Sequence, residues 1–175
     1  MKVTLYMAMS LNNMIAREND EEDFISHDSW TAWLTCIRKH GCMIWGRRTH
    51  QVVKTWDKQY LEDIKGIKVV IVSSNENYDV GDQFELASSP HKALENVQSQ
   101  GFSSAVLTGG SILNSSFAKL NLINEVIVCI EPVLIGAGIP LFNPEKFDLN
   151  LKLLDVDKVS NRLIELRYEV VKNAK

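Results

Sequence analysis

The amino-acid sequence predicts an α/β fold: a single three-layer domain with a mostly parallel central sheet and a C-terminal antiparallel hairpin. Short, nearly continuous apolar runs recur between residues 3 and 130, a pattern typical of strands that are buried on both faces. Segments with apolar residues at helical spacing separate these runs. Residues 149–170 instead alternate apolar and polar side chains, as a hairpin with one solvated face does. Because 175 residues is the size of one ordinary domain, we assign residues 1–175 to it.

Each element is predicted from its local pattern. Strands are expected where β-branched and other apolar residues run together before a turn-forming residue. They cover residues 3–9, 42–45, 67–72, 84–87, 104–107 and 126–130, and the hairpin strands cover residues 149–153 and 164–170. Helical spacing of Trp30, Trp33 and Ile37 after a capping Ser26, and the placement of Pro90 at a first turn, indicate helices. The helices cover residues 26–39, 49–55, 90–100 and 111–120.

Composition limits the class of protein. Hydrophobic residues make up 45% of the chain and charged residues 23%, which is typical of a globular protein. The net charge of -3 argues against a broad basic face for nucleic acid. The longest apolar run, residues 126–142, is broken by charged, proline and glycine residues, so we expect no membrane span. Three cysteines and four histidines lack metal-ligand spacing, which predicts reduced thiols, no metal site and a cytoplasmic protein.

Three strand ends carry residues suited to phosphate. Gly46-Arg47-Arg48-Thr49 leads from a predicted strand into a helix, and Gly109-Gly110-Ser111 does the same further along. Ser73-Ser74-Asn75 ends the most hydrophobic strand. Since ligands of parallel sheets bind beyond the carboxyl ends of the strands, these segments together predict a site for a phosphate-bearing cofactor. Gly136-Ala137-Gly138 does not qualify as a dinucleotide fingerprint, because no helix follows it.

Asp28 is the candidate proton-handling group. It lies near the start of the first predicted helix, beside Trp30 and Trp33, and an acid next to aromatic surface can have a raised pKa. From position alone, a helix-capping role is commoner for such an aspartate. The acidic segment 18–23 is expected to be a solvated loop, although a mobile loop over a cofactor would have the same composition.

The order of these segments resembles the dihydrofolate reductase superfamily over nearly the whole chain. The similar segments are residues 8–16 (its first strand and loop), 46–49 (its glycine-arginine-x-threonine signature), 68–74 (a cofactor-facing strand) and 107–111 (its twin-glycine turn). Residues 122–126 and 132–142 look more like the related pyrimidine reductase domain of riboflavin biosynthesis. The resemblance therefore implies a dihydrofolate reductase-like fold.

The resemblance also implies NADPH-dependent hydride transfer to a pteridine or a similar heterocycle, with roles carried over by position. The residues it implies for the cofactor are Ala8, Ile15, Ala16, Gly46, Arg47, Arg48, Thr49, Ser73, Ser74, Gly109, Gly110, Ser111 and Ile112. Arginine forks suit a dianionic phosphate, which favours NADPH over NADH. The residues it implies for the substrate are Met7, Asp28, Trp30 and Cys129, with Asp28 as the catalytic acid.

Departures from the family bear on the substrate. Cys129 stands where the family has a threonine that backs the acid, and residues 21–24 replace a tryptophan-containing substrate loop. Pyrimidine reductases carry an aspartate-proline-rich motif for the ribose phosphate, and residues 51–57 contain no such motif.

Three functions remain open. The first is reduction of dihydrofolate to tetrahydrofolate. The alternative is the 5-amino-6-(5-phosphoribosylamino)uracil reductase step of riboflavin biosynthesis, and the third is an NADPH-binding protein without catalysis. The C-terminal hairpin offers an edge for pairing, so a homodimer is a further expectation.

Overall fold

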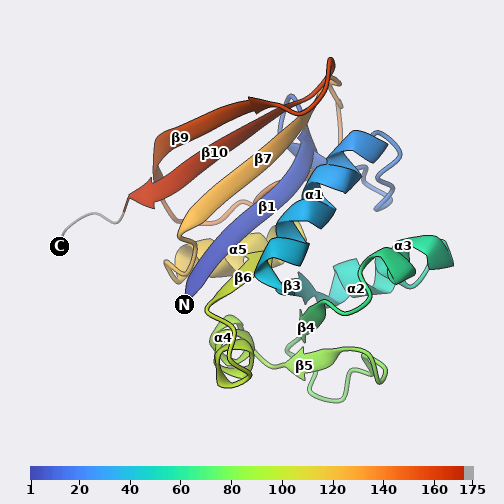
Figure 1. Ribbon diagram of the computed structural model, residues 1–175, viewed down its shortest axis with the longest axis vertical. Coiled ribbons are helices and arrows are strands. Elements are labelled where there is room, and N and C mark those ends of the chain that lie inside the picture. Colours follow the sequence, from blue (N-terminus) through green and yellow to red (C-terminus); the bar gives the residue numbers. More distant parts are fainter. Residues whose placement is uncertain (172–175) are drawn as a thin grey trace.

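A mixed sheet runs through the structure, a computed structural model that describes residues 1–171. Its strands are β1 (Lys2–Ser10), β3 (Cys42–Gly46), β4 (Lys68–Val72), β5 (Glu85–Ala87), β6 (Ser104–Leu107), β7 (Glu125–Glu131), β9 (Asn150–Lys158) and β10 (Ile164–Val171). In space their order is β5-β4-β3-β6-β1-β7-β10-β9 (Figure 1). All pairs from β5 to β7 are parallel, whereas β10 is antiparallel to both β7 and β9. The predicted mostly parallel sheet with a C-terminal hairpin is confirmed.

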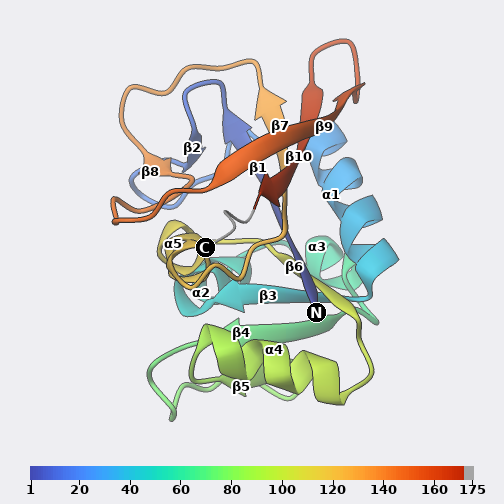
Figure 2. The ribbon, with the colours of Figure 1, turned by 90° about the vertical axis from the view of Figure 1, so that its left-hand side faces the viewer.

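Helices cover both faces of this sheet. One face carries α1 (His27–His40), α2 (Arg47–Val53) and α3 (Lys58–Asp63), and the other carries α4 (Pro90–Ser99) and α5 (Ser111–Lys119) (Figures 1 and 2). Trp33 and Ile37 of α1 pack with Trp45 of β3, while Val97 and Phe117 pack in the core on the opposite face. These two cores confirm the three-layer prediction. Within residues 1–171, no helix is long and apolar enough to cross a membrane.

The boundaries of α1 follow from local chemistry. The Ser26 side chain accepts a hydrogen bond from the Ser29 N–H and so caps the first turn. Gly41 then ends the helix in the left-handed region, at φ +74°. Because Trp33, Leu34 and Ile37 share the buried face, burial of this apolar stripe fixes the rotation of the helix about its axis.

Three short elements were not predicted from the sequence. Strands β2 (Met14–Ala16) and β8 (Ile139–Pro140) pair with each other in a separate antiparallel ribbon, and α3 follows α2. The two strands have three and two residues, too few to show a period. In addition, α2 begins at Arg47 rather than at residue 49, because Gly46 at the strand end already acts as its N-cap.

The hairpin differs from its prediction in two respects, the first being that β9 continues to Lys158 rather than ending at residue 153. We expected one solvated face, but every residue of the edge strand β9 is exposed. The strand lies beyond β10 at the sheet margin, where the helices do not reach (Figure 1). Leucine and valine side chains of β9 consequently face solvent in the isolated chain.

Candidate active site

A cavity of about 650 Å³ lies beyond the carboxyl ends of β3 and β4, where the turn before α5 closes its wall. Its lining includes most of the residues that the sequence implied for the cofactor, namely Ile15, Ala16, Gly46, Arg47, Arg48, Thr49, Ser73, Ser74, Gly110, Ser111 and Ile112. We call it the cofactor cavity. The three phosphate-suited strand ends therefore meet around one space, as the strand order requires.

The glycines allow two turns to approach each other behind this cavity. The Gly46 N–H donates to the Gly109 carbonyl oxygen at 2.9 Å, and Gly109 has φ +92°. A Cβ at Gly110 would lie 3.4 Å from Thr49 Oγ1. Gly109 does not line the cavity itself, and its contribution is to bring the wall residues together.

Polar groups suited to a pyrophosphate lie at the start of α5. No side chain caps this helix, whose N-cap is Gly110, and the buried Ser111 Oγ has no hydrogen-bond partner within the described chain. Free N–H groups at a helix N-terminus, next to an unpaired hydroxyl, fit an anion. The residues present therefore fit the phosphate portion of a dinucleotide.

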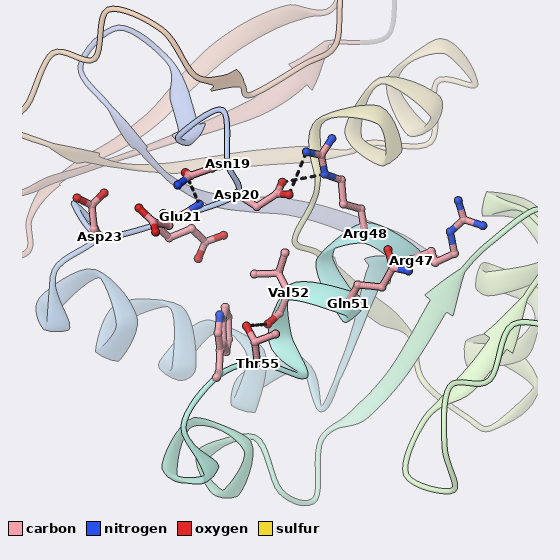
Figure 3. A pocket seen from close by; sticks show the side chains of 11 residues that line it. Asn19, Asp20, Glu21, Asp23, Arg47, Arg48, Gln51, Val52 and Thr55 are labelled. Atoms are coloured by element: carbon pink, nitrogen blue, oxygen red, sulfur yellow. Dashed lines mark hydrogen bonds and ion pairs between the residues drawn. The ribbon is translucent and has the colours of Figure 1, made fainter.

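The two arginines of the cavity differ in their pairing. Arg48 Nε lies 2.8 Å from Asp20 Oδ1, so this arginine bridges α2 and the acidic loop (Figure 3). Arg47 points away from that pair and makes no ion pair with any residue between 1 and 171 (Figure 3). Its unpaired guanidinium remains available for an anion.

A narrower cavity of about 80 Å³ adjoins the first and reaches into the centre of the molecule. Met7, Ala8 and Trp30 line it, as do Trp33 and Trp45. The residues that it shares with the cofactor cavity are Ile15, Glu22, Thr49 and Trp56. We call it the inner cavity, and its mostly apolar, aromatic wall suits a flat ring.

Asp28 does not occupy the position that the sequence suggested. Its side chain is exposed and lines none of the cavities in this cleft. Ser29, the next residue, is buried, lines the inner cavity and lies 3.2 Å from Cys129 Sγ. Successive residues of a helix are rotated by about 100° about its axis, so Asp28 lies on the exposed side of α1 while Ser29 faces the cleft. The geometry therefore does not favour Asp28 as the catalytic acid.

The buried Glu131 anchors the start of α1. Its Oε1 accepts hydrogen bonds from Ser29 Oγ at 2.6 Å, Ser26 N at 2.7 Å and Ser26 Oγ at 2.8 Å. These bonds fix α1 against the end of β7 and leave Cys129 behind Ser29 rather than on a cavity wall. Burial raises the pKa of the Cys129 thiol, so a neutral, packed cysteine is expected there.

Further site residues lie in segments where the sequence showed no motif. A third cavity, of about 270 Å³, is lined by Glu22, Ile25, Ser26, His27, Trp30, Trp56 and Tyr60. Glu22 lines this cavity as well as the inner and cofactor cavities. Glu22 is exposed at the surface of the loop, yet desolvation by the protein atoms around its carboxyl group, together with the neighbouring Asp20, raises its pKa to about 7. The acidic composition of the loop was the available signal, but nothing in it singled out Glu22.

Gly138 is a second site residue that the sequence did not single out. A Cβ at this position would lie only 2.6 Å from the Ala16 carbonyl oxygen, so glycine allows β8 to approach β2 closely. Gly138 belongs to the segment Gly136-Ala137-Gly138, which is not a dinucleotide fingerprint, but this residue does line the cofactor cavity.

Comparisons with known proteins identify the family. Residues 1–164 match the RibD C-terminal domain. The uncharacterized protein YwjB of Bacillus subtilis (strain 168) is 27% identical over 170 residues, which cover 95% of this chain and 97% of that protein. A solved structure from Shewanella sp. PV-4, provisionally named a riboflavin biosynthesis protein, has a TM-score of 0.81 at 19% identity, with 98% and 100% of the two chains covered. RibD of Acinetobacter baumannii has a TM-score of 0.78 at 20% identity, covering 98% of this chain and 58% of its own. These neighbours confirm the dihydrofolate reductase-like fold, and the chain belongs to the RibD C-terminal domain family.

Proposed function

We propose that this protein is an NADPH-dependent reductase of the pyrimidine reductase kind, which transfers hydride to a substrate built on a flat nitrogen heterocycle. The observation that carries the proposal is the junction between the cofactor cavity and the inner cavity. Ile15, Thr49 and Trp56 line both, so two ligands in these cavities would meet face to face at that point. A dinucleotide on one side and a ring on the other is the arrangement that hydride transfer needs.

The cofactor half would hold NADPH through groups that are otherwise unpaired. Ser111 Oγ and the first N–H groups of α5 would bind the pyrophosphate, and Arg47 would pair with the 2′-phosphate. Ile15 and Ala16, both buried, would border the nicotinamide and exclude water from it. When bound, NADPH supplies the hydride, and the chain supplies binding and orientation.

A ribosylaminopyrimidine is the substrate we favour over dihydrofolate. The family match supports this choice, as does the name of a similar solved structure from Thermotoga maritima, a deaminase and 5-amino-6-(5-phosphoribosylamino)uracil reductase. Reduction of dihydrofolate rested chiefly on Asp28, and that carboxylate is exposed outside the cleft.

Loss of NADPH absorbance tests the proposal. Purified protein is mixed with NADPH and, in turn, 5-amino-6-(5-phosphoribosylamino)uracil, the same compound without its phosphate, and dihydrofolate. We expect turnover with a ribosylaminouracil and none with dihydrofolate. Tight NADPH binding without oxidation by any of the three rings would contradict the reductase and favour a non-catalytic binding protein.

A further inference from the structure

Three aromatic side chains form a cage at the outer end of the cleft. The ring centroid of Trp30 lies 5.7 Å from that of Trp56 and 4.9 Å from that of Tyr60, and the last two are 5.9 Å apart. The rings stand edge to face, at interplanar angles of 66–81°. Trp30 Nε1 donates to Asp63 Oδ2 at 3.1 Å, which fixes the orientation of this ring. We call Trp30, Trp56 and Tyr60 the aromatic cage.

The aromatic cage is continuous with the inner cavity. Both spaces are lined by Glu22, Ile25, Trp30 and Trp56. A ligand held in the cage can therefore extend toward Met7 and the junction with the cofactor cavity. Glu22 lies along this whole path, since it also lines the cofactor cavity.

Charge around this path is unfavourable for a phosphate. Within the described chain, neither the inner cavity nor the cage cavity has a lysine or an arginine in its wall, whereas both have Glu22. Two nearby arginines are already paired, Arg17 with Asp23 at 2.6 Å and Arg48 with Asp20 at 2.8 Å. The unpaired Arg47 lines the cofactor cavity, where it is assigned to the 2′-phosphate of NADPH. A phosphate dianion placed in either cavity would meet the Glu22 carboxylate and no lysine or arginine of the wall, and such like-charge contact is repulsive.

We propose that the aromatic cage and Glu22 select a flat nitrogen heterocycle that carries no phosphate, with the ring packed on the cage and a ring N–H donating to the Glu22 carboxylate. The inference rests on the proposed function, because it names the substrate class of the same cleft. It departs from the phosphorylated ribosylaminouracil of the riboflavin pathway. Indole and phenol rings supply the stacking surface, and the carboxylate supplies the one directional contact.

Isothermal titration calorimetry tests the selection without requiring turnover. The protein, with and without NADPH, is titrated with 5-amino-6-ribosylaminouracil and with its 5′-phosphate. We expect the phosphorylated compound to bind at least roughly tenfold more weakly, a difference that shrinks as salt screens the repulsion. Equal or tighter binding of the phosphate, or no binding of either ring, would overturn the inference.

Variants test whether Glu22 and the aromatic cage cause the selection against the phosphorylated compound. Glu22→Gln should raise the affinity for the phosphorylated compound and so narrow the ratio of the two dissociation constants. Its matched control is Glu18→Gln, because Glu18 is exposed on the same loop and lines none of the cavities. Tyr60 is 41% exposed and lies outside the buried core, so Tyr60→Leu should leave the fold intact and weaken binding of both compounds. An unchanged ratio in Glu22→Gln, or unchanged affinities in Tyr60→Leu, would contradict the proposal.

The two proposals fail in different ways. If the reductase proposal is wrong, the unphosphorylated ring binds in the cage but NADPH is not oxidised. If the selection is wrong, NADPH is oxidised and the phosphorylated ring is bound and reduced at least as well as the unphosphorylated one.

Discussion

Two consecutive arginines at the start of α2 have different surroundings. Arg48 is held by Asp20 of the acidic loop, whereas Arg47 has no ion pair within residues 1–171. Only the unpaired guanidinium can bind a phosphate without first breaking an existing pair. The two arginines are adjacent in sequence and both exposed, so they differ mainly in whether the guanidinium group is already paired.

Arg47→Gln should weaken NADPH binding by roughly ten- to a hundredfold and leave NADH binding almost unchanged, because only NADPH carries the 2′-phosphate. Fluorescence titration with both dinucleotides measures this. Arg162→Gln, an exposed change in the hairpin turn, is the control. A similar loss for NADPH and NADH would show that Arg47 does not read the 2′-phosphate.

Glu22 gives the cleft a pH dependence. Its pKa is raised to about 7, so the carboxyl group is mostly neutral below that pH and ionised above it. Discrimination against a phosphorylated ring should therefore grow as pH rises through about 7. The other charged or titratable groups that line the cavities around Glu22 include Asp20, Glu21, Asp23, His27, Arg47, Arg48 and Tyr60.

Dissociation constants for the two rings, measured on either side of pH 7, check this expectation. Histidines also titrate near neutrality, so Glu22→Gln is needed to isolate the contribution of Glu22. The pH dependence of the ratio should be absent from that variant. If it persists, another group is responsible.

At the scale of elements, the ribbon formed by β2 and β8 closes the cofactor cavity. Gly138→Ala would place a methyl group 2.6 Å from the Ala16 carbonyl oxygen, so the two strands must separate. We expect a loss of about 1–3 kcal/mol in the free energy of unfolding, together with weaker NADPH binding. Chemical denaturation measures the first, and Gly136→Ala is the matched control, since a Cβ there would meet nothing within 4 Å. Equal stability of the two variants would contradict the close packing.

The main strands and the phosphate-suited turns could be predicted because they depend on local patterns. Gly46 and Gly109 mark strand ends by their residue type, and the parallel order of the strands then brings them together. The sequence did not determine which side chains of α1 face the cleft. Asp28 and Ser29 are neighbours in the sequence, but only packing of Trp33 and Ile37 decides which of them faces the cleft.

The aromatic cage could not be predicted for a different reason. Trp30 comes from α1, whereas Trp56 and Tyr60 come from the segment between α2 and the end of α3. Their proximity depends on how these helices pack on one face of the sheet, which no local pattern encodes. Each tryptophan, taken alone, is most simply interpreted as a core residue.

At the scale of the whole molecule, the hairpin presents an uncovered apolar face. Leu151, Leu153 and Val156 of β9 are 45–53% exposed, and Ile164 of β10 is 41% exposed. The pairing register places them on the same side of the hairpin as Leu166 and Tyr168. An edge strand with this composition invites pairing with a second copy of the chain, as the sequence also suggested.

We therefore expect a homodimer that dissociates in Leu153→Glu, because the introduced carboxylate would be buried against its own copy in the interface. Light scattering after size-exclusion chromatography gives the mass directly. Lys152→Glu changes the charge of the adjacent, opposite-facing residue and should leave the dimer intact. A monomeric parent protein, or a dimer that Leu153→Glu leaves unchanged, would rule out this interface.

The central claim is that one cleft brings NADPH and a flat nitrogen heterocycle together for hydride transfer. Its most direct test is NADPH oxidation with 5-amino-6-ribosylaminouracil, together with identification of the product. We expect one molecule of the ribosylaminouracil to be reduced, at the C1′ carbon of its sugar, for each NADPH consumed, and a lower rate in Ser111→Ala because NADPH binds more weakly. NADPH that binds but is never oxidised in the presence of this ring, its phosphate or dihydrofolate would contradict it.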